Sequence, residues 1–181
     1  MKKIAIFASG SGSNAENIIQ YFAQKPQFCV KSVFCNVPDA YVLERAKKYN
    51  VPTLVFNRSE LRDPEKMLHQ LQADGIDFII LAGFLWLMPA CITAAFPNRI
   101  INIHPSLLPA FRGAHAIEQA LEYGVKVFGV TIHYVDGELD GGRIIAQRAF
   151  PYEGSDIEEL EPMIHAVEYP LYIETIKKLI E

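Results

Sequence analysis

Short apolar runs alternate with helix-length amphipathic stretches over the first two-thirds of the chain. The runs are apolar at consecutive positions, which is typical of strands buried on both faces of a parallel sheet that helices cover. The pattern predicts an α/β fold with strands at residues 4–8, 30–35, 53–56, 78–82 and 100–103. The intervening helices are expected at residues 14–23, 41–49, 64–75 and 89–95.

The pattern changes after Pro109. A helix expected at 114–123 precedes two β-rich runs, 125–135 and 143–150, and the turn-forming segment between them predicts an antiparallel pair. Ser155 and Glu158 have the spacing of a capping box and predict the start of a terminal helical region, which Pro162 and Pro170 are expected to divide. The whole chain, 1–181, is expected to be one domain with a Rossmann-like, mostly parallel sheet, helices on both faces and an antiparallel C-terminal extension.

Composition narrows the class of protein. The chain has 181 residues, half of them hydrophobic, and a formal charge of −4, which argues against a nucleic-acid partner. Its three cysteines are an odd number without CxxC spacing, so neither a disulfide framework nor a cysteine zinc site is expected. No apolar run is long enough for a membrane span, and the first apolar run ends too early for a signal peptide. We expect a cytoplasmic protein without a metal.

A glycine-rich turn, Gly10-Ser11-Gly12-Ser13-Asn14, lies between the first expected strand and the first expected helix. Such a turn resembles the dinucleotide pattern, but that pattern also needs an acidic residue about twenty positions later. The second strand ends instead in Cys35-Asn36, so NAD is not expected. No Walker motif is present. We interpret Gly12, Ser13 and Asn14 as a monophosphate site; the alternative is a plain turn capped by Ser13 or Asn14.

Three side chains suggest acyl-transfer chemistry. Asn102 and His104 stand at the end of the strand expected at 100–103, and Asp140 stands in a glycine-rich loop. Residues i and i+2 of a strand share a face, so the amide and the imidazole are expected to point into one cleft. An asparagine N–H can stabilise a developing oxyanion, and histidine is the usual proton carrier near neutral pH. Each residue alone is equally compatible with a structural hydrogen bond or a turn.

The motifs together resemble those of the folate-dependent formyltransferase family. They are 102–109 (NIHPSLLP), 129–135 (GVTIHYV), 139–142 (LDGG), 81–84 (LAGF) and the N-terminal 9–14 (SGSGSN). The resemblance covers nearly the whole chain. It implies a formyltransferase fold, with a phosphate-binding half at about 1–100 and a catalytic and folate-binding half at about 101–181.

The resemblance also implies an activity. The donor would be 10-formyltetrahydrofolate, and the N-terminal motif is similar to that of the branch that formylates the amine of glycinamide ribonucleotide in purine biosynthesis. The protein would work as a monomer or homodimer. The implied catalytic residues are Asn102, His104 and Asp140. The implied ribonucleotide site is Gly12, Ser13, Asn14 and Glu168. The implied folate site is Arg62, Leu85, Trp86, Leu87, Met88, Asn102, Asp136, Gly137, Glu138, Leu139 and Asp140.

Some residues depart from the family pattern. Trp86 stands where an arginine usually follows the Ala-Gly-Phe segment, Phe111-Arg112 replaces a more usual Pro-Gly-Leu context, and Tyr169 stands where histidine is common. Relatives that act on methionyl-tRNA or sugar nucleotides carry a further C-terminal domain, and the hydrolase of the family carries an N-terminal one. We expect neither extra domain in this protein, and therefore neither activity. A non-catalytic nucleotide-binding module remains the alternative of a different class.

The chemistry leads to one electrostatic expectation. If Asp140 pairs with His104, the carboxylate should favour the imidazolium and raise the pKa of His104. A protonated His104 and Asn102 would then stabilise the oxyanion together, while Asp140 helps to move a proton from the amine to the departing nitrogen.

Overall fold

The computed structural model describes residues 1–180, which form seven strands in the hydrogen-bonded order β3-β2-β1-β4-β5-β6-β7. The chain divides into two compact units, Met1–Ile101 and Asn102–Glu181, and the boundary falls inside strand β5 (Ile100–His104). The expectation that the two form one domain with distinct binding halves stays a prediction.

The first unit contains a parallel sheet. Strand β1 (Lys2–Ala8) pairs with β2 (Phe28–Cys35) on one side and β4 (Phe78–Leu81) on the other, and β2 pairs with the short β3 (Thr53–Val55). The register places Phe7 beside Phe34, and their rings stack with centroids 4.7 Å apart in the core. Strand β1 is buried from Ile4 onward, which agrees with its continuous apolar sequence.

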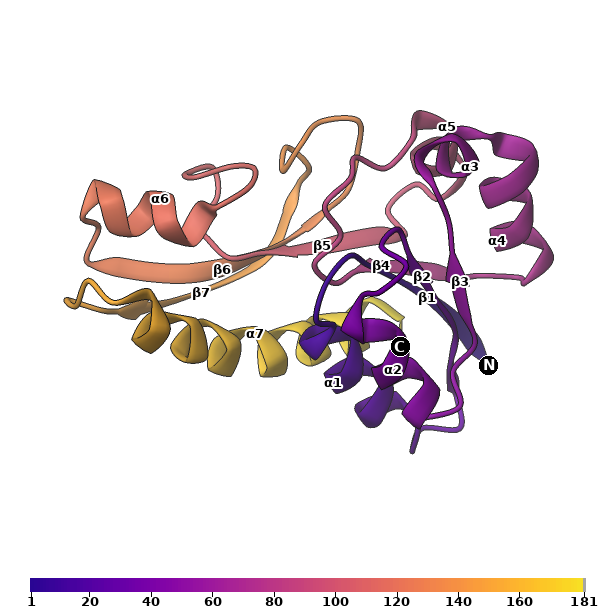
Figure 1. The fold of residues 1–181 in the computed structure, drawn as a ribbon, viewed down its shortest axis with the longest axis horizontal. Coiled ribbons are helices and arrows are strands. Elements are labelled where there is room, and N and C mark those ends of the chain that lie inside the picture. Colours follow the sequence, from indigo (N-terminus) through magenta and orange to yellow (C-terminus); the bar gives the residue numbers. More distant parts are fainter. Residues whose placement is uncertain (181) are drawn as a thin grey trace. The chain divides into compact units, whose positions relative to one another are not determined.

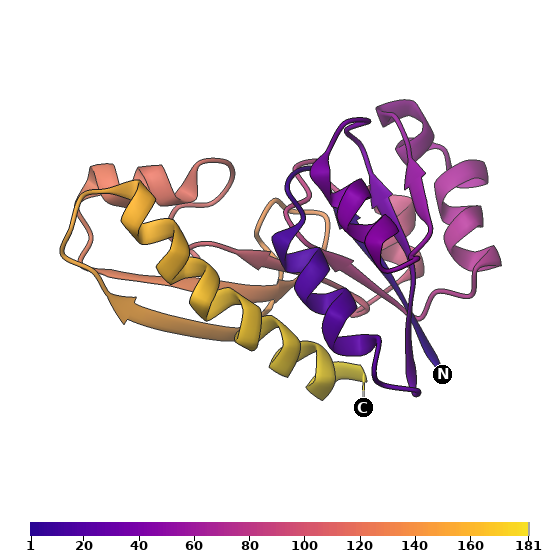
Figure 2. The same ribbon diagram turned by 60° about the horizontal axis from the view of Figure 1, so that its bottom comes forward.

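Helices cover both faces of this sheet. Helices α1 (Ser13–Phe22) and α2 (Tyr41–Lys48) lie on one face, and α4 (His69–Ala73) and α5 (Ala90–Ala95) lie on the other (Figures 1 and 2). The helix expected at 64–75 is found, but its first part is π-helical. The structure has a short helix α3 (Arg58–Arg62), a π-helical turn η1 (Pro64–Leu68) and then α4. The periodicity of the sequence did not reveal this, because Met67 and Leu71 are buried at ordinary helical spacing.

The second unit is built on an antiparallel pair. Helix α6 (Ala116–Tyr123) follows β5 and leads into strand β6 (Val127–Tyr134), which pairs antiparallel with β7 (Ile144–Pro151). Together with the parallel pairs of the first unit, this confirms the expected α/β class with an antiparallel C-terminal extension. Among residues 1–180 no helix is long and apolar enough to cross a membrane.

The C-terminal helix corrects two expectations. Helix α7 (Ile157–Ile180) is continuous, with Pro162 and Pro170 inside it. It is also capped by Asp156, whose carboxylate accepts the Glu158 N–H at 2.8 Å, and not by Ser155. Every fourth side chain is buried along the helix, namely Leu160, Ile164, Glu168, Tyr172 and Ile176. This stripe, with the packing of α7 on β6 and β7, outweighs the roughly 3 kcal/mol that an interior proline costs a helix.

Candidate active site

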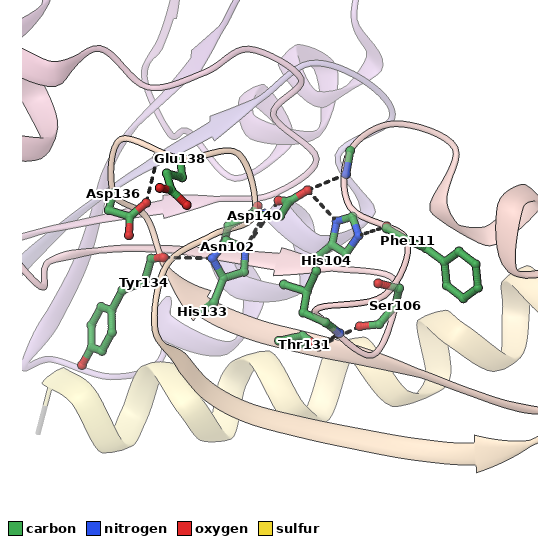
Figure 3. A network of polar contacts seen from close by, with 12 residues as sticks. Asn102, His104, Ser106, Phe111, Thr131, His133, Tyr134, Asp136, Glu138 and Asp140 are labelled. Carbon is green, nitrogen blue, oxygen red and sulfur yellow. Dashed lines mark hydrogen bonds and ion pairs between the residues drawn. The ribbon is translucent and has the colours of Figure 1, made fainter.

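Four polar side chains converge within the second unit (Figure 3). Asn102 and His104 come from β5, His133 from β6, and Asp140 from the loop between β6 and β7. Asp140 contacts both imidazoles: its Oδ2 lies 3.4 Å from His104 Nδ1 and its Oδ1 lies 3.6 Å from His133 Nε2. The structure therefore brings together the three residues singled out from the sequence, with His133 as a fourth member.

His104 is held between two acceptors. Its Nε2–H donates to the Phe111 carbonyl at 2.8 Å, while Nδ1 faces Asp140. The imidazole is only 5% exposed. Burial lowers the pKa of His104, and although the Phe111 carbonyl and Asp140 raise it, the pKa stays below its ordinary value. Asp140 therefore raises the pKa of His104 as expected, but the expected protonated His104 is wrong, because the sequence did not reveal how deeply the ring is buried.

Asp140 stays ionised in this setting. Its Oδ2 accepts the Gly113 N–H at 2.8 Å. Burial acts to raise the pKa of Asp140, but the contact with His133, the Gly113 N–H and the charge of a protonated His104 or His133 together lower it. Asp140 also adopts left-handed backbone angles, with φ 49°, a conformation that costs a non-glycine residue on the order of 1–3 kcal/mol. The fold thus tolerates strain at the residue that contacts both imidazoles.

His133 fixes the orientation of the Asn102 amide. Its Nδ1 lies 2.9 Å from the Tyr134 carbonyl, which can only accept, so in the neutral ring Nδ1 carries the proton and Nε2 accepts from Asn102 Nδ2 at 3.2 Å. One amide N–H of Asn102 is used in this way and the second remains to donate elsewhere. The sequence does not identify the partner of His133, because the pairing crosses from β6 to β5.

The loop that carries Asp140 is tightly built. The Asp136 carboxylate accepts the Glu138 N–H at 2.9 Å, and Tyr134 N–H bonds to the Arg143 carbonyl at 3.0 Å. A Cβ on Gly142 would collide with the Tyr134 carbonyl, so this position requires glycine. Of the residues expected to line the folate site, Asp136, Gly137, Glu138 and Leu139 are exposed. The loop is therefore held by hydrogen bonds where it leaves β6 and enters β7, while residues 136–139 are exposed to solvent.

The glycine-rich turn belongs to the first unit. Gly12 is the N-cap residue of α1 with φ 76°, and neither Ser13 nor Asn14 caps the helix. Helix α2 holds the turn from outside, since Val42 N–H donates to the Gly10 carbonyl at 3.2 Å and Arg45 donates to the Ser11 carbonyl at 2.8 Å. The first N–H groups of any helix lack intrahelical partners. In α1 these groups include those of Ser13 and Asn14, directly after the turn. This geometry favours the interpretation as an anion-binding site over that of a plain capped turn.

The Gly12 position gives a testable prediction. We expect Gly12→Ala to destabilise the protein by about 2–4 kcal/mol and to displace the turn, because a Cβ there would lie 2.8 Å from Val42 Cα at a positive φ. Gly10→Ala is the matched control, since a Cβ at Gly10 meets no atom within 4 Å. Chemical denaturation of both variants measures the difference. Equal free energies of unfolding would contradict this account of the turn.

The segment expected to line the folate pocket also lies in the first unit. Leu85 and Leu87 are exposed, Met88 is buried, and the Leu85 N–H donates to Ser9 Oγ at 3.0 Å. Trp86 carries the guanidinium of Arg58 4.8 Å above its ring. The resemblance implies Arg62, which is exposed on the last turn of α3. The arginine found at this segment is Arg58, which the sequence did not single out.

Glu168 completes the set of predicted residues. It is buried on α7. The pKa of the neighbouring Tyr172 phenol is raised well above its ordinary value, first by burial and then by the charge of the Glu168 carboxylate.

Within residues 1–180 no cluster of three or more histidine, cysteine or acidic side chains could hold a metal ion. The polar cluster of the second unit can still perform proton transfer, because a buried carboxylate–imidazole pair stands beside an amide donor.

Comparisons with known proteins agree with this chemistry. The sequence profile of a family described as formyl transferase matches residues 2–176. A phosphoribosylglycinamide formyltransferase of Bacillus subtilis is 39% identical over 99% of this chain and 95% of its own length. One of Escherichia coli is 36% identical over 94% of this chain and 84% of its own length. A solved structure of glycinamide ribonucleotide transformylase 1 from Geobacillus kaustophilus superposes with a TM-score of 0.91, with 42% identity and both chains covered completely.

Proposed function

The chain belongs to the formyl transferase family, and we propose that it transfers the formyl group of 10-formyltetrahydrofolate to the amine of glycinamide ribonucleotide. The product is the formylated ribonucleotide of purine biosynthesis. The relatives that carry this activity in their names match nearly the whole chain. The observation that carries the proposal is the contact of Asp140 with both His104 and His133, beside the oriented amide of Asn102.

The chemistry follows from the protonation states of these groups. Because the pKa of His104 is lowered, the ring is neutral near pH 7, and its Nδ1 is free to take up a proton. When the amine nitrogen attacks the formyl carbon, Asn102 donates its second N–H to the oxygen that gains charge. The amine proton passes to the His104–Asp140 pair. The imidazolium formed then has an acceptor on each side, the Phe111 carbonyl and Asp140.

The reaction ends when the bond between the formyl carbon and the folate nitrogen breaks. The proton held by the His104–Asp140 pair goes to that nitrogen, so protons and electrons balance without an acyl-enzyme. Holding both substrates together replaces the need for a covalent intermediate, since orientation alone lowers the barrier by several kcal/mol. None of the three cysteines takes part in this route.

The remaining site assignments are also proposals. Gly12, Ser13 and Asn14 would bind the phosphate of the ribonucleotide, and Glu168 would contact its glycinamide end. The folate would contact the segment 85–88, the loop 136–140 and an arginine, for which both Arg62 and Arg58 are candidates. The lowered pKa of Asp140 supports its assignment as an ionised group at the reacting end. A monomeric or dimeric cytoplasmic enzyme remains the expectation.

A steady-state assay tests the proposed function. The purified protein is mixed with 10-formyltetrahydrofolate, and deformylated folate is followed with and without glycinamide ribonucleotide. We expect turnover that depends on the amine and gives one formylated ribonucleotide per folate released. Turnover without the amine would identify a hydrolase, and binding without turnover would identify a nucleotide-binding module. Either result would overturn the proposal.

A further inference from the structure

A three-residue loop holds both partners of the proton-transferring pair through its backbone. The carbonyl of Phe111 accepts from His104 Nε2 at 2.8 Å, and two residues later the Gly113 N–H donates to Asp140 Oδ2 at 2.8 Å. Phe111 and Gly113 both have positive φ, 54° and 83°. The loop is therefore bent into an unusual shape that presents an acceptor to His104 and a donor to Asp140.

A non-glycine residue keeps a positive φ only where its surroundings impose that conformation. Figure 3 shows the ring of Phe111 pointing away from His104 while its backbone faces the imidazole. The ring meets Tyr123 at the end of α6, edge to face, with centroids 5.9 Å apart. Tyr123 is 81% exposed, so its contact with Phe111 contributes little to the core. Tyr123 is thus a large aromatic side chain on the surface that contacts the ring of Phe111.

We propose that Tyr123 is a positioning residue, which through the Phe111 ring keeps the Phe111–Gly113 loop in hydrogen-bonding contact with His104 and Asp140. The expected effect of Tyr123 on kcat rests on the proposed formyl transfer. Its expected effect on the surroundings of His104 does not, and it can be measured in the protein without substrates.

The sign of the effect on His104 follows from the groups that face its ring. Besides Phe111, these are Asp140 on the loop after β6, which raises the pKa, and His133 on β6, which lowers it. Burial lowers it most. If the loop loosens, the Phe111 carbonyl no longer holds the Nε2 proton, and the pKa of His104 falls further. Asp140 loses the Gly113 N–H at the same time, so the pKa of Asp140 rises.

Four single variants and one double variant test the proposal. Tyr123→Ala removes the aromatic partner, Tyr123→Phe retains it, and Phe111→Gly removes the ring while easing the positive φ of the backbone. Glu122→Ala is the matched control, because Glu122 is an exposed neighbour on the same helix. The double variant Phe111→Gly with Tyr123→Ala measures whether the two residues act together. The measurements are the NMR titration of His104 in the free protein, kcat and KM as functions of pH, and thermal unfolding.

We expect Tyr123→Ala to lower kcat about 2- to 10-fold, the factor that one aromatic pair is worth, with KM and Tm nearly unchanged. The titration of His104 and the acid limb of kcat/KM should both move to lower pH. Tyr123→Phe and Glu122→Ala should behave like the wild type, and the double variant should be no worse than Phe111→Gly alone. A Tyr123→Ala protein with an unshifted His104 titration, or multiplicative effects in the double variant, would overturn the proposal. The NMR result stands even if the protein shows no formyl transfer.

Discussion

Replacing Asp140 with asparagine is expected to lower kcat by about 10³-fold, within the range that general acid–base catalysis contributes. The asparagine keeps the size of the side chain and one acceptor oxygen, so the loop between β6 and β7 should retain its shape. It cannot hold the proton that leaves the amine. It also removes the negative charge that Asp140 presents to both His104 and His133. KM for the amine substrate should change far less than kcat.

The control for this variant is Glu153→Gln, which removes one carboxylate from an exposed position of the same unit. Circular dichroism and thermal unfolding of both variants establish that the fold is intact. An Asp140→Asn enzyme that retained kcat within about 5-fold of the wild type would exclude Asp140 from proton transfer, since loss of a positioned acid or base costs far more. A parallel loss of kcat in Glu153→Gln would point to a non-specific charge effect.

A variant at Asp140 also alters the pH dependence of folding. The pKa of Asp140 is lowered in the folded protein, so its ionised form contributes stability above its unfolded pKa of 3.8, and this contribution is lost as pH falls through the lowered value. The lowered pKa of His104 has a different consequence. Below its unfolded pKa of 6.5 the unfolded chain gains a proton that the folded ring resists, so burial of His104 reduces stability as the solution becomes acidic.

Much of the fold was predictable because the spacing of apolar residues along the chain indicates which strands and helix faces are buried. The runs that became β1 and β4 are apolar on both faces, and each lies inside the sheet of the first unit. The terminal helix was not predictable in the same way. Pro162 and Pro170 are local signals for a break, while the evidence that overrides them is the packing of α7 on β6 and β7. Tertiary contacts of that kind leave no local trace.

The candidate site shows the same division. The spacing of Asn102 and His104 on one strand indicated that they share a face, and a turn-rich loop indicated where Asp140 stands. The partners supplied by the backbone, the Phe111 carbonyl and the Gly113 N–H, have no sequence signal because every residue carries these groups. The net direction of the His104 pKa could not be predicted for a related reason, although the raising effect of Asp140 was. It depends on how much of the ring is buried, which only the folded structure determines.

The second large effect is expected from Asn102→Ala, which should lower kcat about 10²- to 10³-fold by removing an oxyanion donor worth roughly 3–4 kcal/mol. His133 orients the amide, so the donor is already in place before charge develops on the formyl oxygen. An interaction that strengthens only as charge develops lowers kcat and leaves substrate binding almost unchanged when it is lost.

Calorimetric Kd values for both substrates should therefore stay close to those of the wild type in Asn102→Ala. Asn102→Asp gives a sharper comparison, because it keeps the shape and replaces the donor with a negative charge next to Asp140. It should be at least as slow as Asn102→Ala. Gln24→Ala removes an exposed amide from the first unit and serves as the control. If Kd rises while kcat stays unchanged, Asn102 binds the ground state and the transition state alike, and its role as an oxyanion donor is excluded.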